Sequence, residues 1–262
     1  MNILAIDTST KVASVAVKFN DKIISKNVSN EITHSEKLLP LVDEILKKSD
    51  TDIKSMNILA CSNGPGSFTG IRIGLATIKG FGNVLKKPIF AINSTLLLAV
   101  EDFFLNKDID TSKPIYICSL MDARNERAYY GIYLFKKDKN DKLLVTELLT
   151  VSNDYIDEIL NKISSLNLNK DVPLIFCGNC ISHFESVIVN YYSNTINTTE
   201  AEQQEVIISK ANVFPDAKYI IKYLENSNDI KNNKNMYDYN TLDAVYARMS
   251  QAERMKKSES KR

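Results

Sequence analysis

Two strands that both end on an aspartate decide the fold of this chain: Ile3-Leu-Ala-Ile-Asp7 at its start and Ile115-Tyr-Ile-Cys-Ser-Leu-Met-Asp122 near its middle. After each comes a polar turn and a pair of apolar runs separated by an Asn/Asp-containing turn, the usual pattern of a β-hairpin. An amphipathic helical pattern then follows. The runs and helices are Val12–Phe19, Ile23–Val28 and His34–Ser49 in the first set, and Ala128–Phe135, Leu143–Val151 and Asn153–Ser164 in the second.

This repetition predicts one strand–strand–strand–helix unit written twice. A duplicated unit with an acid at the end of its first strand indicates an α/β fold of the actin-like, ribonuclease-H-like class, with two lobes built on mixed sheets. In that fold the paired aspartates, here Asp7 and Asp122, face the cleft between the lobes. We expect a first lobe over residues 1–108, a second over 109–226, and a linker with a partly helical tail over 227–262.

The remaining apolar runs complete both lobes. The Asn- and Lys-rich stretch 227–239 predicts a mobile linker, and 241–258 a tail that is helical in part. The other expected elements are strands at Asn57–Ser62, Pro88–Ile92, Pro173–Cys177 and Val206–Ser209, and helices at Phe68–Lys86, Thr95–Leu105, Ser182–Tyr192 and Pro215–Glu225.

Composition narrows the function. The chain has 262 residues and a net charge of +1, and a protein that holds nucleic acid by itself normally carries a clear basic excess. Its start lacks the basic and apolar pattern of a signal peptide, and no apolar run approaches the ~18–20 residues that span a bilayer. We therefore expect a cytoplasmic protein without a membrane partner. Four cysteines in a chain of this length do not indicate a disulfide framework.

The strongest local motif is Asn63-Gly-Pro-Gly-Ser-Phe-Thr-Gly70, called the glycine loop below. Ser67 is the expected N-cap of the helix that follows. Two interpretations stay open: a tight strand-to-helix turn, or an anion site at the helix N-terminus. No lysine follows Gly70, so the loop is not the phosphate loop of P-loop enzymes. The candidate residues for a nucleotide or anion are Asp7, Thr8, Ser9, Thr10, Gly64, Gly66 and Ser67.

The helix after the glycine loop carries several glycines, each of which costs about 1 kcal/mol relative to alanine. We expect a neighbouring helix of the same lobe, or another chain, to approach its backbone closely. The helix His34–Ser49, bent or loosened by Pro40, has an apolar arc of roughly 160°, wider than one buried face requires. Its own lobe could hide the excess, or a partner could cover it. The candidate partner residues are Leu38, Leu39, Val42, Leu46, Ile71, Gly74, Leu75 and Ile78.

Five motifs together resemble the bacterial TsaB (YeaZ) family: Asp7-Thr-Ser-Thr10, His34-Ser-Glu-x-Leu-Leu-Pro40, Gly64-Pro-Gly-Ser-Phe-Thr-Gly-Ile-Arg-Ile-Gly74, Asp122-Ala-Arg124 and Tyr246-Ala-Arg-x-Ser-Gln-Ala-Glu253. The resemblance is dense in the first lobe and is carried only by pattern from about Leu143 to Lys234. In the tail, Ala244 and Ala247 stand where the family usually has Pro and Leu.

The resemblance implies a non-catalytic scaffold and activator subunit. Its partners would be a TsaD-type catalytic subunit and a TsaE-type ATPase, in the complex that transfers a threonylcarbamoyl group to the tRNA adenosine 3′ of the anticodon. It implies no cofactor of this chain's own, with ATP and a metal ion in the partner subunit. It also implies tRNA contact only through the complex, and a homodimer when the chain is alone.

Other classes of function depend on features that the sequence lacks. A stand-alone ATP-dependent phosphotransferase of this fold needs a second glycine turn after Asp122, where Ala, Arg and Asn stand instead. A metallopeptidase needs clustered histidines, but the only two are His34 and His183. Cys177-Gly-Asn-Cys180 together with His183 allows a redox or zinc role as a further alternative, without a fourth ligand.

Overall fold

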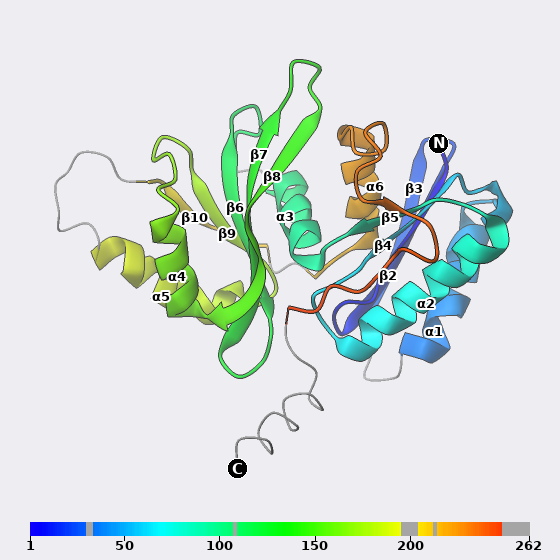
Figure 1. Ribbon diagram of the computed structural model, residues 1–262, viewed down its shortest axis with the longest axis horizontal. Coiled ribbons are helices and arrows are strands. Elements are labelled where there is room, and N and C mark those ends of the chain that lie inside the picture. Colours follow the sequence, from blue (N-terminus) through cyan, green and yellow to red (C-terminus); the bar gives the residue numbers. More distant parts are fainter. Residues whose placement is uncertain (30–33, 107–108, 195–203, 212–213, 248–262) are drawn as a thin grey trace, which may run out of the picture.

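The structure is a computed structural model that describes residues 1–29, 34–106, 109–194, 204–211 and 214–247. Two mixed sheets stand side by side, each with helices on its outer face (Figure 1). The elements of the first unit are β1 (Ile3–Asp7), β2 (Val12–Phe19), β3 (Lys22–Ser29), α1 (His34–Lys48), a 3₁₀ turn (Ile53–Ser55), β4 (Ile58–Ser62), α2 (Phe68–Leu85), β5 (Ile89–Ile92) and α3 (Ser94–Leu105).

The second unit repeats this order of elements. Its members are β6 (Ile115–Asp122), β7 (Arg127–Lys137), β8 (Leu143–Tyr155), α4 (Ile156–Ser165), β9 (Leu174–Cys177), α5 (Ile181–Asn194), β10 (Val206–Ile208) and α6 (Ala217–Asn226). In both units the first strand pairs antiparallel with the second and parallel with the fourth. The strand orders β5-β4-β1-β2-β3 and β10-β9-β6-β7-β8 therefore correspond strand for strand, and the predicted duplication and actin-like fold are confirmed.

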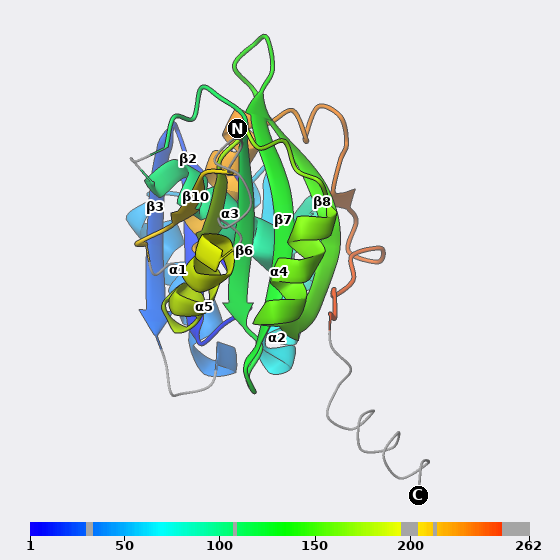
Figure 2. The same ribbon diagram turned by 90° about the vertical axis from the view of Figure 1, so that its left-hand side faces the viewer.

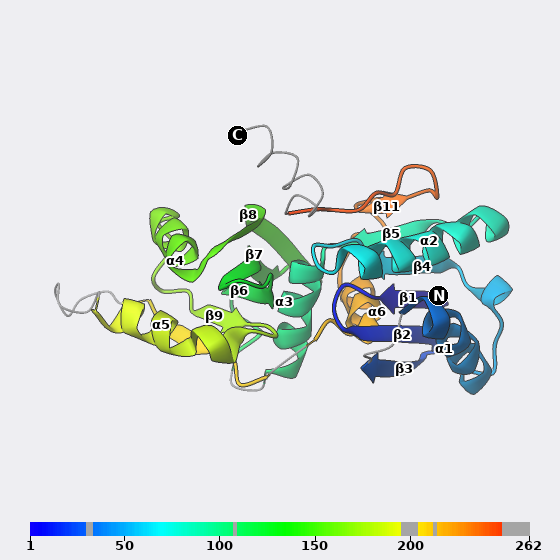
Figure 3. The same ribbon diagram turned by 90° about the horizontal axis from the view of Figure 1, so that it is seen from below.

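The last helix of each unit packs on the sheet of the other unit. Helix α3 lies against β6, β7 and β9, whereas α6 lies against β1, β2 and β4, and the two helices contact each other between the sheets (Figure 3). Helices α4 and α5 cover the outer face of the second sheet (Figure 2). The predicted division at residues 108 and 226 stays a prediction for folding units, but helix packing does not follow it, because α3 and α6 exchange sheets.

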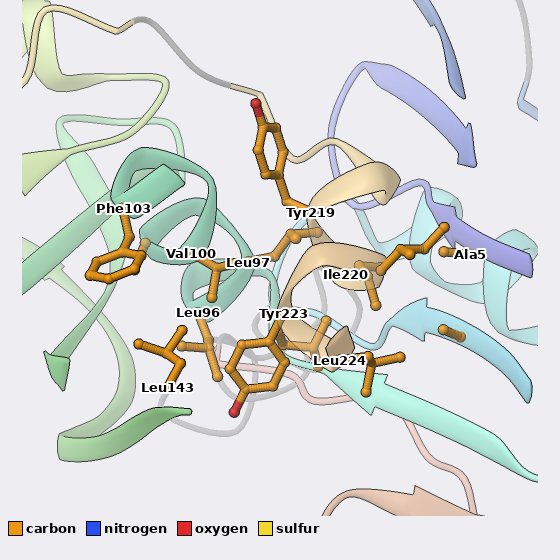
Figure 4. Close-up of a cluster of buried hydrophobic side chains, with 14 of the residues drawn as sticks. Ala5, Leu96, Leu97, Val100, Phe103, Leu143, Tyr219, Ile220, Tyr223 and Leu224 are labelled. Carbon is orange, nitrogen blue, oxygen red and sulfur yellow. The ribbon is translucent and has the colours of Figure 1, made fainter. Parts of the chain in front are cut away.

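Small residues let α6 approach the first sheet closely. Ala16, Ala5 and Ala60 are cross-strand neighbours on β2, β1 and β4, and all three are fully buried in the core that contains α6. Bulkier side chains there would hold the helix away from the sheet. This core is continuous between the units: side chains of α3 and α6, including Val100 and Ile220, meet in the space between the two sheets (Figure 4).

Residues 227–247 differ from the sequence-based expectation. The stretch predicted as a mobile linker contains the short strand β11 (Met236–Tyr237), which pairs antiparallel with β5 and extends the first sheet to six strands. Asp229 is buried there and accepts a hydrogen bond from Tyr223 Oη at 2.8 Å. Residues 241–247 of the tail, which is predicted to be helical in part, are not helical, and residues 248–258 lie outside the described residues.

No helix in the described ranges combines the length and the apolar character that a transmembrane segment requires.

Candidate functional site

The glycine loop and the turn after β1 fit into one another at the carboxyl edge of the first sheet. Ser67 N–H donates to the Ser9 carbonyl oxygen at 2.7 Å, and Thr8 Oγ1 donates to the Gly70 carbonyl at 2.7 Å. A Cβ atom added to Gly66 would overlap the Ser9 carbonyl, and one added to Gly70 would overlap the Thr8 carbonyl. These glycines are therefore required by the β1–β2 turn of the same chain.

The predicted close approach to the α2 backbone is real at Gly74 and Gly82, where groups of the same unit make it, and none of these groups belongs to a neighbouring helix. A Cβ on Gly74 would overlap Thr8 Oγ1, and one on Gly82 would lie 2.8 Å from Ile89 Cδ1. The approaching groups are thus a turn and a strand of the first unit. Gly80 is the exception: it is exposed, and no atom of the described chain lies within 4 Å of its added Cβ.

The geometry of the glycine loop favours the tight turn over the anion site. Ser67 is the N-cap of α2 as predicted, with its Oγ accepting from Gly70 N–H at 3.2 Å. Its own N–H is already bonded to Ser9. The candidate side chains Thr8, Ser9 and Thr10 are buried, so a ligand would have to displace the chain's own turn before it reached them.

Asp7 ends β1 in a fully buried position. Its carboxyl group accepts hydrogen bonds from Ser62 Oγ, from Ser9 Oγ at 2.8 Å and from Ser9 N–H at 3.2 Å. Burial nonetheless raises the pKa of Asp7 to about 7, because the charged form loses its hydration. Asp7 is therefore largely protonated below neutral pH, and its buried side chain caps the turn after β1.

Two further acids accompany Asp7 between the sheets. Burial, together with the nearby charge of Asp216, raises the pKa of Glu101, on α3, to about 8. Glu101 Oε2 accepts from Asp216 N–H at 3.2 Å, while Asp216 accepts from Asn27 Nδ2 at 2.8 Å and pairs with Lys218 Nζ at 2.9 Å. Glu101 and Asp216 thus lie between the sheets close enough to Asp7 for their charges to interact with it.

The second predicted aspartate, Asp122, does not share this environment. It is exposed, and its Oδ1 accepts from Arg124 N–H at 2.7 Å, so it caps the turn after β6. Residues 124–126 all have left-handed φ angles, between 55° and 62°. Asp7 and Asp122 both cap turns, but only Asp7 is buried.

The cysteine motif is part of the second core. Cys177 and Cys180 are free, buried thiols, and burial raises the pKa of Cys180 to about 12. A Cβ at Gly178 would overlap the Leu120 carbonyl, which explains the glycine between them. His183 Nε2 lies 2.9 Å from a Glu126 carboxylate oxygen instead of facing the thiols. In the described ranges, His, Cys, Asp and Glu side chains form no group of three that could hold a metal ion.

Most of the predicted partner residues are buried inside their own unit. On α1 and α2, only Leu39 of the eight candidates is exposed, at 54% of its full accessible area. The wide apolar arc of α1 is used by β2, β3 and α2, and Leu242 adds to the same core. The prediction of a partner surface is therefore wrong for the seven candidates that are buried in this core or beneath the Thr8 turn. These are Leu38, Val42, Leu46, Ile71, Gly74, Leu75 and Ile78.

The outer face of α2 is nevertheless exposed and carries mostly small side chains along one stripe. Ala76, Gly80 and Val84 follow one another at helical spacing and are exposed, Val84 to 79%. Such spacing places them along one stripe of the helix. Leu39, on the packed neighbour α1, is a further exposed apolar side chain of the first unit.

Comparison with known proteins identifies the family of this chain. Residues 22–203 match the family described as TsaD: tRNA N6-adenosine threonylcarbamoyltransferase. The tRNA threonylcarbamoyladenosine biosynthesis protein TsaB of Buchnera aphidicola subsp. Schizaphis graminum is 30% identical over 226 residues, covering 86% of this chain and 94% of the relative. The chain belongs to the TsaB (YeaZ) family.

Two further comparisons, one with a TsaB sequence and one with a solved structure, show the extent of the similarity. TsaB of Escherichia coli K12 is 33% identical over 143 residues, or 53% of this chain and 57% of that protein. A solved Pseudomonas aeruginosa protein with similarity to peptidase YEAZ has a TM-score of 0.72 at 19% identity, covering 94% of this chain and 99% of its own. At that identity the likeness shows the fold alone, while the sequence relatives confirm the resemblance drawn from the five motifs.

Glu101 and Asp216 were not among the residues singled out from the sequence. For Glu101 a signal existed: Glu101-Asp102 interrupts the apolar run Leu96–Phe104 within a helix. Acids at such positions are buried when the helix is covered on all sides. The sequence does not say that α3 lies between two sheets, so the signal could be read only after the helix exchange was known.

Proposed function

We propose that this chain acts in tRNA threonylcarbamoyladenosine biosynthesis as a non-catalytic subunit that binds a TsaD-type transferase through the outer face of α1 and α2. The observation that carries the proposal is the open stripe of α2. Gly80 weakens its own helix, and no neighbour in the described chain accounts for it. A partner backbone packed against the stripe would supply the missing reason.

The non-catalytic part of the proposal is supported by the hydrogen bonds of the two aspartates at the strand ends. An actin-like phosphotransferase needs room for phosphates at the end of its first strand, together with a second cradle across the cleft. Here Asp7 is buried and hydrogen-bonded to the chain's own serines, and Asp122 is exposed and caps a turn. ATP and the metal ion would then belong to the partner, and a TsaE-type ATPase would act on the complex. tRNA would be contacted through that complex.

The same face would serve a second copy of this chain when the partner is absent. A TsaD-type partner is itself expected to be actin-like, and the match of this chain to the TsaD family description supports that relation. Two related units that present equivalent helices can pair in either combination. A homodimer would then compete with the heterodimer for one surface.

Partner binding is tested by Leu39→Glu against a matched control. Val189 on α5 is also an exposed aliphatic side chain, but it lies on the second unit. We expect Leu39→Glu to weaken binding of the TsaD-type subunit at least about tenfold, or about 1.4 kcal/mol, and to dissociate the homodimer as well. Val189→Glu should change neither. Calorimetry and size-exclusion chromatography measure both, and full partner affinity in Leu39→Glu would refute the surface.

A separate measurement addresses the absence of catalysis. Titration of the isolated chain with ATP and magnesium should give no saturable heat in the micromolar range and no steady hydrolysis. Micromolar binding with turnover would favour the alternative of a stand-alone enzyme of this fold.

A further inference from the structure

The segment 242–247, called the strap below, leaves β11 and runs along α2 toward the boundary between the two sheets (Figures 1 and 3). Its first residue, Leu242, is fully buried in the core beneath α2, and its carbonyl oxygen accepts from Lys79 Nζ at 2.8 Å. Further along, Val245 N–H donates to the Asn63 carbonyl at 2.7 Å. The strap is therefore anchored to the first unit along its length.

Tyr246 fastens the strap to the start of α2. Its ring is stacked on Phe68 with centroids 4.4 Å apart and planes 8° from parallel. Arg72 Nε donates to Tyr246 Oη at 2.9 Å, and the guanidinium carbon lies 5.5 Å and 5.7 Å from the two ring centroids. This cluster remains 42% exposed at Tyr246, so it joins two surface elements rather than filling a core.

The next residue of the strap belongs to the other side of the boundary. Ala247 packs against a small apolar cluster formed by α3 and the turn region of β6 and β7, whose buried members are Leu98, Met121, Ala123 and Tyr129. From Tyr246 to Ala247 the strap thus passes from the first sheet's helix layer to the second sheet. Gly64 adjoins the crossing, because a Cβ there would overlap the Val245 carbonyl.

The opposite end of the interlobe boundary is held by different contacts. Lys142 Nζ, in the β7–β8 turn, donates to the Glu225 carbonyl of α6 at 2.7 Å, and Asn228 Nδ2 donates to Asp138 Oδ2 at 3.3 Å. A bridge between Leu143 and Ser227 adds to them. Because α6 packs on the first sheet, these contacts join the two sheets at a second place along the shared core.

We propose that the strap is an interlobe latch that holds the two units together at the Asp7 end of their boundary. When Tyr246 leaves Phe68 and Arg72, Ala247 loses its fixed position on the second unit, and this end of the boundary opens while the Lys142 end stays closed. The latch is a property of the isolated chain. Since Arg72 and Lys79 also border Ala76 on α2, partner binding would bear on the latch, a step that rests on the proposed function.

Hydrogen exchange of the full chain tests the latch without any partner. Tyr246→Ala should speed amide exchange about five- to tenfold on both sides of the boundary, in peptides over residues 8–10 and 119–123. Peptides over 136–143, at the other end, should be unchanged. Tyr155→Ala is the matched control: Tyr155 is similarly exposed and pairs with Arg127, but both lie in the second unit.

A second variant distinguishes a strap that joins the two units from one that only covers α2. Ala247→Glu keeps Tyr246 on Phe68 but places a carboxylate against the apolar cluster of the second unit. The latch requires faster exchange at 119–123 in this variant too. Faster exchange confined to 63–72 in Tyr246→Ala, or unchanged exchange at 119–123 in both folded variants, would overturn the proposal.

Discussion

Replacing Asp7 by asparagine should stabilise the protein at alkaline pH, because the buried carboxyl group costs stability when it ionises. The pKa of Asp7 is about 7 in the folded chain, against an ordinary value of 3.8 for an aspartate side chain. The difference of about 3 pKa units corresponds to about 4 kcal/mol at 1.36 kcal/mol per unit. A raised acid pKa gives no penalty below the unfolded pKa, and the full penalty is reached above the folded pKa.

The expected change in the free energy of unfolding differs between pH 5 and pH 8. At pH 5 the wild-type carboxyl costs about 1.5 kcal/mol, and at pH 8 about 4 kcal/mol. The asparagine loses about 1–2 kcal/mol, because its NH₂ group takes the place of Asp7 Oδ2 and cannot accept the hydrogen bond from Ser9 N–H. Asp7→Asn should therefore be near neutral at pH 5 and more stable than wild type by about 2–3 kcal/mol at pH 8.

Urea unfolding at several pH values between 5 and 8 measures this difference. The chain has no tryptophan but 12 tyrosines, so circular dichroism and tyrosine fluorescence are suitable signals. Asp43→Asn is the control, since this exposed acid pairs only with Lys47 on the surface, and it should change stability by less than about 0.5 kcal/mol. An Asp7→Asn effect that is independent of pH, or that favours wild type more at pH 8 than at pH 5, would refute a largely protonated Asp7.

Two further substitutions test the assignment of surface and core on α2. Gly80→Ala should raise the free energy of unfolding of the isolated chain by about 1 kcal/mol, because no described atom outside the surrounding helix backbone lies within 4 Å of the added methyl group. It should also weaken binding of the TsaD-type subunit, and a gain in both would contradict close approach there. Leu75→Glu should lower the unfolding free energy by several kcal/mol, because Leu75 is buried in the first unit. A Leu75→Glu variant as stable as Leu39→Glu in thermal unfolding would show that this core is not closed.

The local patterns of the sequence were sufficient for the elements and for the duplication. Short apolar runs bounded by turn residues mark buried strands, so β1, β2 and β6 have the predicted ends. The cap at Ser67 needs only neighbours within one helical turn. The family motifs are likewise short contiguous runs, and the membership that they predicted is confirmed by the relatives.

The sequence alone did not determine which apolar and glycine residues face solvent, because that depends on groups distant along the chain. Gly64 is required by Val245, and Asn27 lies beside Asp216, only because the folded chain brings these pairs together. The exchange of α3 and α6 between the sheets buries Glu101 and raises its pKa. Such contacts follow from how two complete sheets pack, and neither the strand period nor the helix period encodes that packing.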